Sequence, residues 1–303
     1  MIGEGVISTR PSRTRSVNFE SEAVAMQAQL VTVIIPTYNR LNCLVELIES
    51  LYQQTHRQLQ IVIVNDAGPS VDHVRTLYPE LDITVLNMPH NRGQVQALNY
   101  GLEFARSEYI MLCDDDDLLV PSHTERALRT IGDYDLVYAD AEIFQYAVDQ
   151  DGVRRATNRF VFAYELDLDA MRQFSTFVPS GCLYCRSLHE RIGLFDPEVA
   201  HYFDWDFFLR VAAIGSIKRM PVASVLYAFA PAGDNISANL NTMRPYLDKL
   251  SSKHGLGDLP TANFFLLLEE PEIQKRRATT EVLWDGQPFI PRRLGTAPPR
   301  NHV

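Results

Sequence analysis

Short apolar runs alternate with helical patterns along the first 120 residues of the chain. Four runs are apolar almost throughout, as in strands that are buried on both faces of a sheet. They cover residues 30–36, 60–64, 83–86 and 109–113. After the first run, apolar residues recur at three- and four-residue steps from Leu41 to Leu51, which predicts a helix with Asn39 as a candidate N-cap. A second helix is predicted over about residues 94–106.

The order of these elements predicts the fold class. Alternating strands and helices form a mostly parallel sheet with helices on both faces and right-handed crossovers, the Rossmann-like α/β arrangement. Ligands of such sheets bind beyond the carboxyl ends of the strands. Thr37, Tyr38, Asp66 and the carboxylates that begin at Asp114 all follow predicted strands. We therefore expect three separate segments of the sequence to converge on one crevice.

The second half of the chain is predicted to continue the same domain. It contains a helix, a strand, a polar hairpin or loop, a turn that enters a strand, a helix with two acids near its start, and a last strand. In chain order these cover residues 121–131, 135–140, 148–158, 177–186, 201–212 and 224–230. Two further helical patterns lie between residues 239 and 272, the second with Phe264, Phe265, Leu267 and Leu268, and Pro and Arg are frequent from Gly286 onward.

Composition and charge exclude several classes of protein. The 303 residues are 46% hydrophobic and 22% charged, as is ordinary for a globular protein with a packed core. The formal net charge of −10 argues against nucleic acid as the main partner. No apolar run approaches the length that spans a bilayer. The four cysteines do not form a disulfide scaffold, and the C-x-x-C pair Cys182 and Cys185 lacks a second pair for zinc, so a reducing cytoplasm fits best.

Four consecutive carboxylates, Asp114–Asp117, follow the fourth apolar run. Like charges packed this closely raise one another's pKa, so a folded protein that keeps them normally supplies a cation. Carboxylate oxygens are the ligands that Mg²⁺ and Mn²⁺ prefer, with water and phosphate oxygens in the remaining positions. The alternative is a solvated acidic turn that caps the helix beginning near Pro121.

A second pair of acids, Asp204 and Asp206, lies among aromatic residues at the start of a predicted helix. Asp204 could be an acid of the first turn, stabilised by the helix dipole by about 0.5–2 kcal/mol. It could equally be a general base, because apolar rings beside a carboxylate raise its pKa toward neutrality. The local sequence favours neither role.

Taken together, these segments resemble the inverting glycosyltransferases of family 2, which have the GT-A fold, over about residues 31–237. The matches are the opening strand with its loop, the acidic end of the second strand, the Asn-x-Gly segment, the D-x-D signature and the E-D-W-[DE] motif. In this chain they read Val31–Arg40, Val64–Gly68, Asn91–Gly93, Asp114–Asp117 and Phe203–Asp206.

The chain departs from the family pattern at several positions. Asn65 replaces an Asp, Leu98 stands where many members have Arg, and Phe203 replaces the Glu of the E-D-W-[DE] motif. After the last strand, residues 227–230 read Tyr-Ala-Phe-Ala instead of Tyr-Arg-x-His, whose His can help to hold the metal. Metal binding is then expected to depend more on the acid cluster and the diphosphate, or the activity is expected to be weak.

The resemblance implies roles for the residues of the crevice. The donor would be a nucleotide-diphosphate sugar, first of all a UDP-sugar, bound with Mn²⁺ or Mg²⁺. Asp66 would accept a hydrogen bond from the uracil imide, Tyr38 would stack on the base or fix its pocket, and Asp204 would be the catalytic base. The metal ligands would be Asp116 and Asp114. The nucleotide-sugar site would comprise Pro36, Thr37, Tyr38, Asn39, Asp66, Asn91, Gly93, Asp114 and Asp115.

The resemblance also implies a domain division and a substrate class. A flexible extension is expected over residues 1–28, a nucleotide-binding half over 29–120, an acceptor half over 121–238, a helical extension over 239–285 and a mobile tail over 286–303. The acceptor would be a hydroxyl of a glycan, a glycolipid or another cell-surface polysaccharide precursor, and the transferred group a hexosyl or N-acetylhexosaminyl unit. Homodimer formation and peripheral association with the inner face of the membrane are both compatible with the sequence.

Three other classes compete with this interpretation. A dinucleotide-binding oxidoreductase would carry G-x-G-x-x-G after the first strand, where this chain has Pro36–Asn39. A sugar nucleotidyltransferase would need a Gly-rich basic loop at the same place. A catalytically weak GT-A domain that binds a nucleotide or glycan, or scaffolds a partner, is favoured by the missing His and the replaced Glu and stays open.

Overall fold

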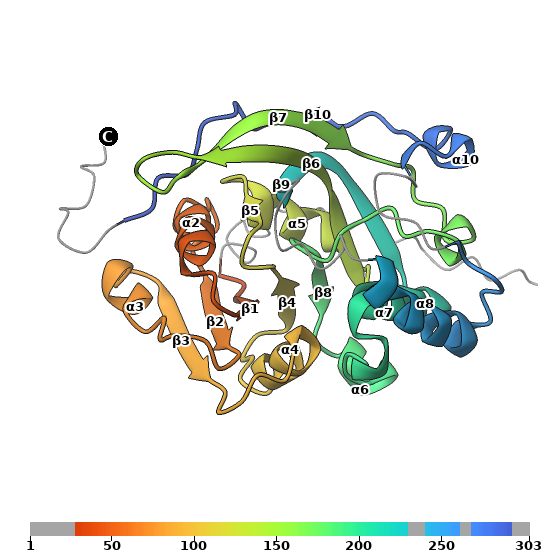
Figure 1. Cartoon of the computed structure of the whole chain (residues 1–303), viewed down its shortest axis with the longest axis horizontal. Helices are drawn as coiled ribbons and strands as arrows, with labels where there is room; N and C mark the ends of the chain where they lie inside the picture. Colours follow the sequence, from red (N-terminus) through yellow and green to blue (C-terminus); the bar gives the residue numbers. More distant parts are fainter. Residues whose placement is uncertain (1–27, 230–239, 261–267, 293–303) are drawn as a thin grey trace, which may run out of the picture.

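The first half of the chain forms a parallel sheet. The computed structural model describes residues 28–229, 240–260 and 268–292. Strands β1 (Val31–Thr37), β2 (Leu59–Asn65), β3 (Asp82–Asn87) and β4 (Tyr109–Leu112) pair in parallel in the spatial order β4-β1-β2-β3 (Figure 1). The four strands predicted from the apolar runs are confirmed, each to within one residue at either end.

Alternate residues of β1 face two different layers of the core, which places helices on both faces of the sheet. Val33 joins the apolar cluster that contains α2 (Leu41–Tyr52), whereas Ile34 joins the cluster that contains α4 (Gln94–Leu102). Gly101 of α4 lies so close to the strand that a Cβ there would be 2.7 Å from Ile34 Cγ2. Only glycine allows the helix to approach the sheet this closely.

The second half of the chain extends the same sheet with strands of both directions. β6 (Leu136–Val148) and β9 (Ile217–Phe229) pair in parallel, and β8 (Leu183–Cys185) pairs antiparallel with both β4 and β6. The complete order is β10-β9-β6-β8-β4-β1-β2-β3. β5 (Leu118–Leu119) pairs with β9, β7 (Arg154–Phe162) pairs with β6, and β10 is Glu281–Val282. The sheet is mixed but mostly parallel, as the sequence predicts.

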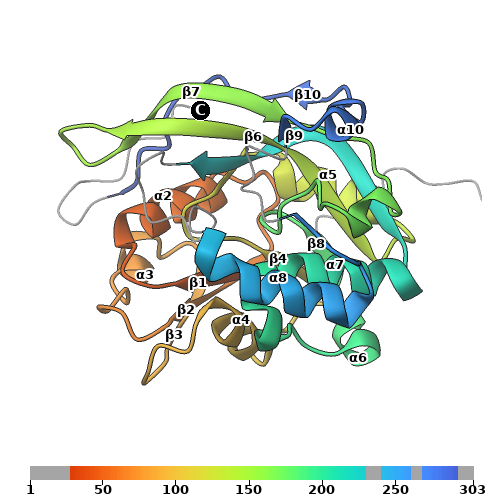
Figure 2. The same cartoon turned by 45° about the vertical axis from the view of Figure 1, so that its right-hand side comes forward.

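Short helices connect and cover these strands. In chain order they are α3 (Val74–Leu77), α5 (His123–Ile131), η1 (Ala170–Arg172), α6 (Leu188–Ile192), η2 (Pro197–Tyr202), α7 (Phe203–Ile214), α8 (Leu240–His254) and α10 (Pro271–Gln274). In Figure 2, α8 lies in front of α7.

Several predicted boundaries differ from the structure. Helix α4 ends at Leu102 because the amides of Phe104 and Ala105 hydrogen-bond only three residues back, which tightens the chain into a turn. Asn39 is not the N-cap of α2: its φ of 60° places it in the left-handed region, and Arg40 takes the cap position without a side-chain cap. Residues 148–158 belong to the β6–β7 hairpin, whose strands are longer than expected.

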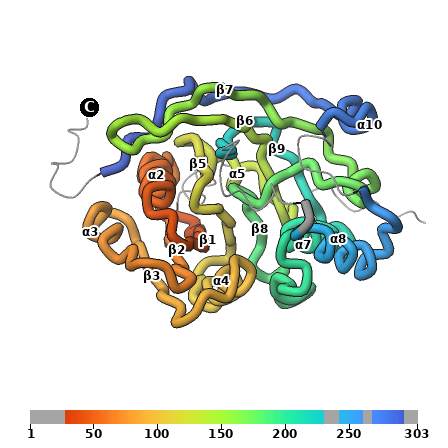
Figure 3. Tube along the Cα trace, viewed as in Figure 1, coloured from red at the N-terminus to blue at the C-terminus, as the bar shows by residue number. Residues whose placement is uncertain are grey.

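The C-terminal region is less purely helical than the sequence suggests. After α8 and α10, β10 pairs in parallel with Val222 and Ala223 of β9. Residues 286–292 pack against the domain, with Phe289 in the core and Arg292 over the rings of Tyr52 and Tyr78. The chain therefore does not become a mobile tail at Gly286. Figure 3 shows this last segment running along β7 and back toward α2.

Some predictions concern residues outside the described part of the chain. These are the N-terminal extension up to residue 27, the end of the tail from residue 293, and the second helical pattern, of which only Leu268 among its four large apolar residues is described.

Candidate active site

A cleft of about 960 Å³ lies beyond the carboxyl ends of β1, β2 and β4. Every residue that the sequence assigns to the donor, the metal or the catalytic base lines this cleft. They are Pro36, Thr37, Tyr38, Asn39, Asp66, Asn91, Gly93, Asp114, Asp115, Asp116 and Asp204. The structure thus gathers at one site side chains that come from five separate segments of the sequence.

Hydrogen bonds fix the first two acids of the cluster. Thr37 Oγ1 donates to Asp115 Oδ2 at 2.6 Å, and Gln94 Nε2 donates to Asp114 Oδ1 at 2.6 Å. The backbone N–H of Asp114 donates to Ser180 Oγ at 3.0 Å. The end of β1, the start of α4 and the turn before β8 therefore meet at this turn and set its shape.

The third acid has a cationic partner. Arg40 Nη1 lies 2.5 Å from Asp116 Oδ2 and 3.6 Å from Asp115 Oδ1. The fourth acid points into the core, where Asp117 Oδ1 accepts the backbone N–H of Ala228 at 3.1 Å. Asp117 therefore has a structural role, because its hydrogen bond joins the acid cluster to β9.

The electrostatics of the cluster favour a bound cation. Burial, together with the charges of Asp116, Asp115 and Asp204, raises the pKa of Asp114 to about 8. Burial and Asp116 raise the pKa of Asp115 to about 7, although Thr37 and Arg40 oppose the shift. At neutral pH, negative charge in this turn is thus costly even with Arg40 beside it.

The donor atoms fit Mg²⁺ or Mn²⁺. Asp114 and Asp116 both line the cleft, and both are half-buried. Within the described ranges, no group of three or more His, Cys, Asp and Glu side chains forms a ready-made metal cage. An ion at this place would be held by one or two carboxylates and by the phosphates of a ligand. Arg40 would have to share Asp116 with it.

Asp66 organises the neighbouring loop. Its two carboxylate oxygens accept the backbone N–H groups of Arg92 and Gly93 at 2.8 and 2.7 Å. Asn65, which replaces the expected acid, uses its side chain within its own turn, where Oδ1 accepts the N–H of Gly68 at 3.0 Å. The substitution at Asn65 is therefore structural, since an amide can both donate and accept there.

Asp204 lies in the first turn of α7, two residues after the cap residue Tyr202. Burial raises its pKa to about 6, the charge of Asp206 adds to this, and the backbone N–H groups of Trp205 and Asp204 oppose it. Trp205 Nε1 donates to the carbonyl of Met171 at 2.7 Å and anchors the turn. Asp204 is thus both a first-turn acid and a carboxylate whose pKa suits proton acceptance near neutral pH.

Several residues to which the sequence assigned no role in the donor, metal or base site also line the cleft. Arg40, Arg92 and Gln94 face it from the donor side. An apolar wall completes the other side, with Phe174, Phe177, Tyr202, Met243, Tyr246, Leu247 and Leu259. Its α8 members carry no motif; only the helical spacing of Met243, Leu247 and Leu250 indicates a face that packs inward.

The C-x-x-C pair is not a redox or metal site in this structure. Both thiols are free; Cys182 is buried and its Sγ donates to the carbonyl of Val178, whereas Cys185 is half-buried. Burial raises the pKa of both thiols, which makes them poor nucleophiles.

A cleft at the carboxyl ends of parallel strands, lined by carboxylates from the end of β4 and from α7, is compatible with nucleotide-sugar-dependent glycosyl transfer. The chain matches the family described as "Glycosyl transferase family 2" over residues 32–193 and belongs to it. It is 51% identical to the uncharacterized glycosyltransferase YwdF of Bacillus subtilis over 263 residues, which cover 86% of this chain and 98% of YwdF. It is 27% identical to the uncharacterized glycosyltransferase RT0329 of Rickettsia typhi, over 62% of this chain and 60% of that one.

Solved structures share the GT-A fold. The S. aureus TarS 1–349 complex with UDP-GlcNAc matches with a TM-score of 0.56 and 18% identity, over 77% of this chain and 68% of that one. The mannosyltransferase PcManGT from Pyrobaculum calidifontis, in complex with GDP-Man and Mn²⁺, matches with a TM-score of 0.56 and 19% identity, over 80% and 72%. Separately, no helix in the described part of the chain is both long and apolar enough to cross a membrane.

Proposed function

We propose that this protein is a metal-dependent inverting glycosyltransferase that moves a hexosyl or N-acetylhexosaminyl group from a UDP-sugar to a hydroxyl of a glycan, glycolipid or other polysaccharide precursor. One observation carries the proposal: the acid cluster and Asp204, whose pKa is raised to about 6, line the same cleft, where the charge of Asp204 helps to raise the pKa of Asp114. The two fold relatives that hold UDP-GlcNAc, or GDP-Man with Mn²⁺, support a nucleotide-sugar donor.

The donor would bind along the carboxyl ends of β1, β2 and β4. Tyr38 is 47% exposed, so its ring offers a face on which a base can stack. Asp66 holds the loop of Asn91 and Gly93 in place and would accept the imide N–H of uracil with a lone pair that the loop amides leave available. Pro36, Thr37 and Asn39 would form the floor of this half.

Asp116 and Asp114 would hold the Mn²⁺ or Mg²⁺, with Asp115 locked by Thr37 beside them. Bound there with the diphosphate, the ion supplies Lewis-acid stabilisation of the leaving group. Arg92, which lines the same half of the cleft, places a further positive charge near a diphosphate.

Asp204 would accept the proton of the acceptor hydroxyl. The hydroxyl oxygen forms a bond to the anomeric carbon from one face while the bond from that carbon to the diphosphate oxygen breaks on the other. The proton moves to the Asp204 carboxylate, and the electron pair of the broken bond leaves with the nucleotide diphosphate. This single displacement inverts the anomeric configuration.

We expect this chemistry in the cytoplasm, where nucleotide sugars are made, with an acceptor that is soluble or held at the inner face of the membrane. Homodimer formation is compatible with this scheme, and nucleic acid is not expected as a partner because the net charge is −10.

Asp204→Asn tests the base. The amide keeps the shape of the side chain but cannot accept the proton, so cleavage of a UDP-sugar should fall by about 10²–10⁴-fold. The affinity for UDP with Mn²⁺, measured by calorimetry, should stay close to that of the wild type because the nucleotide half is untouched. Unchanged turnover would remove Asp204 from the mechanism.

Asp116→Asn tests the metal site, with Asp72→Asn as a control because Asp72 is an exposed acid outside the cleft. The enthalpy change on adding UDP should depend on Mn²⁺ in the wild type and in the control but lose that dependence in Asp116→Asn. A variant that still binds UDP only with Mn²⁺ would show that the metal lies elsewhere.

A second candidate function is nucleotide or glycan binding without transfer. It is favoured by Arg40, which already pairs with Asp116, and by Ala230, which stands where many family members carry a His. Incubation with UDP-GlcNAc, other UDP-sugars and GDP-mannose in Mn²⁺ separates the two functions, since only a transferase releases the nucleotide diphosphate.

A further inference from the structure

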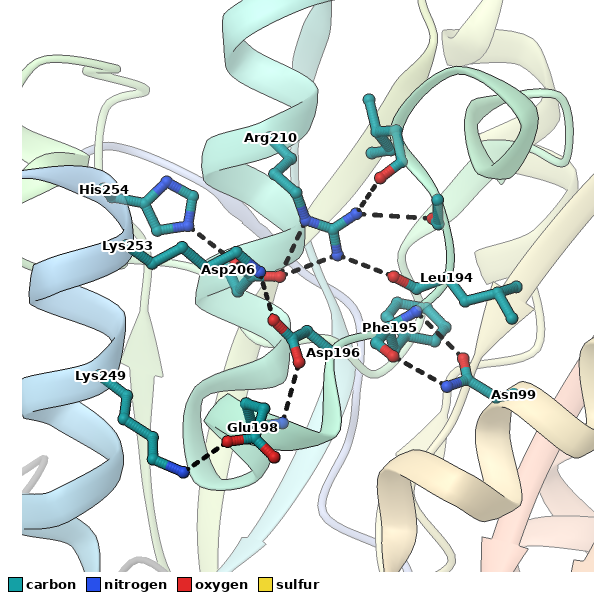
Figure 4. Close-up of polar contacts among 12 residues, drawn as sticks. Asn99, Leu194, Phe195, Asp196, Glu198, Asp206, Arg210, Lys249, Lys253 and His254 are labelled. Carbon is teal, nitrogen blue, oxygen red and sulfur yellow. Dashed lines mark hydrogen bonds and ion pairs between the residues drawn. The ribbon is translucent and has the colours of Figure 1, made fainter.

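Asp206 is a fully buried carboxylate on α7, one turn into the helix that carries Asp204. Its Oδ2 accepts from Arg210 Nε at 2.8 Å, and its Oδ1 lies 2.7 Å from Lys253 Nζ and 2.8 Å from His254 Nε2 (Figure 4). One acid in the protein interior is thus surrounded by side chains of two helices, α7 and α8.

The same cluster reaches the donor half of the fold. Arg210 also donates to the carbonyls of Ile192 and Leu194, at 2.7 and 3.2 Å. The next residue, Phe195, exchanges two hydrogen bonds with the side chain of Asn99 on α4 (Figure 4). A continuous set of polar contacts therefore joins α8, α7, the segment before η2 and α4.

The other end of α8 forms part of the cleft. Met243, Tyr246 and Leu247 line the same cavity as Asp204. Met243, Leu247 and Leu250 are buried and lie on the helix face that continues to His254. From residue 243 to 254 a helix rises roughly 16 Å. A buried ion pair that fixes the C-terminal end of α8 therefore also fixes the orientation of the side chains at its other end, where Met243 lines the cleft.

We propose that Asp206 is a positioning residue that fixes α8 as a wall of the cleft, and that α8 thereby determines how the acceptor is held against Asp204. That α8 lies on the acceptor side of the cleft rests on the proposed function. That Asp206 fixes the position of α8 does not. Asp206 touches neither the donor site nor the cleft surface, because it is completely buried and does not line the cleft.

The two lysines of α8 differ sharply in how much their ion pairs contribute to holding the helix in place. Lys249 pairs with Glu198 at 2.7 Å, but both side chains are more than half exposed, so the pair is screened by solvent. Lys253 instead lies between the buried Asp206 and Asp196, at 2.7 and 2.6 Å. Removing the partners of a buried carboxylate leaves its charge uncompensated, whereas removing an exposed partner changes little.

The first test measures hydrogen exchange of the full-length chain by mass spectrometry in Lys253→Met/His254→Gln, with Lys249→Met as the matched control. The double variant keeps the Asp206–Arg210 pair and removes only the contacts from α8. Peptides of residues 242–254 should exchange at least tenfold faster in the double variant, while peptides of β1 and β2 and the control protein keep the wild-type rates. Equal loosening in Lys249→Met, or no loosening in the double variant, would overturn the fixing of α8.

The second test separates positioning from mere stability. With UDP-GlcNAc as the probe and water as the acceptor, the double variant should lower kcat roughly tenfold to a hundredfold, because a displaced wall misaligns the attacking group. KM for UDP-GlcNAc and the affinity for UDP with Mn²⁺ should not change, as the donor site lies on the other half. Loosened α8 with unchanged kcat would refute the positioning role, and so would a loss of UDP affinity in step with kcat.

The two experiments also distinguish this inference from the proposed function. If the wild type cleaves none of the tested nucleotide sugars, the proposed function fails, while the exchange rates of α8 still decide whether Asp206 fixes the helix. Asp206→Asn offers a second variant on the α7 side, and it should loosen the same peptides, since an amide cannot balance the charges of Arg210 and Lys253.

Discussion

Arg154 holds the turn that carries Asp116, and its replacement by Met should destabilise the protein although Arg154 does not line the cleft. Its guanidinium Nε lies 2.5 Å from Glu46 Oε2, and its Nη1 donates to the carbonyl oxygen of Asp116 at 2.6 Å. Both charged side chains are 3% exposed. The hairpin of β6 and β7 is thus tied through one arginine to α2 and to the turn that carries Asp116.

The structure sets the size of the effect. Arg154→Met leaves the Glu46 carboxylate buried without its partner, which destabilises a protein by about 3–5 kcal/mol. The rings of Phe144 and Tyr146 pack on the guanidinium and would pack on Met instead. Within the described residues, Arg154 Nη2 has no hydrogen-bond partner, and losing this unsatisfied donor offsets part of the penalty. We expect a loss near the lower end, about 3 kcal/mol.

Urea denaturation of the two proteins measures this free energy. Arg155→Met is the matched control, because Arg155 is the next residue on β7 and pairs with Asp149 at the surface with 53% of its side chain exposed; its loss should be below about 1 kcal/mol. The double variant Glu46→Met/Arg154→Met should recover most of the stability, since it removes both charges. A loss below about 1 kcal/mol in Arg154→Met, or no recovery in the double variant, would refute the buried-pair reasoning.

Three further predictions concern pH and backbone geometry. The pKa values of Asp114 and Asp115 are raised to about 8 and 7, so their contribution to stability is present at acidic pH and is lost as pH rises through these values. Mn²⁺ should therefore raise the Tm more at pH 8.5 than at pH 5.5. An equal shift in Tm at the two pH values would contradict this reasoning. The rate of nucleotide-sugar cleavage should rise with pH around 6, where Asp204 loses its proton, and a profile flat from pH 5 to 7 would argue against that base. Gly181→Ala should lower the free energy of unfolding, measured in urea, by roughly 2–5 kcal/mol, because φ is +74° and the new Cβ would meet a core valine at 2.7 Å. Gly152→Ala, at φ +75° in open space, should lower it by only about 1 kcal/mol. Equal losses in the two variants would show that the contact with the valine is unimportant.

The strands that could be predicted are those in which every residue along the strand is buried. β1, β2 and β4 are buried on both faces, so their sequences are apolar without interruption and their ends could be placed to within a residue. The acids at their carboxyl ends could then be assigned to one cleft, because parallel strands end on the same side of a sheet.

The parts that could not be predicted depend on contacts between distant segments. Nothing near Arg40 distinguishes it from a surface arginine until the fold brings Asp116 to it, 76 residues later. Likewise Asp206 reads as a first-turn acid, and only the arrival of Lys253 and His254 on another helix reveals its partners. β10 has only two residues, which is too short for a periodic signal in the sequence. These residues pair because β9 offers them a free edge.

The segment that ends at Arg292 affects the order in which contacts can form during synthesis. The guanidinium of Arg292 lies 4.1 Å from the ring centre of Tyr52 and 4.9 Å from that of Tyr78, and it pairs with Glu80. Tyr78 is synthesised 214 residues before Arg292. A nascent chain that has already formed β1, β2, β3 and β4 would therefore lack the contact of Arg292 with this aromatic pair until residue 292 has been made. Chains truncated shortly before residue 292 would keep the residues that line the cleft but would leave the rings of Tyr52 and Tyr78 without the guanidinium that packs on them.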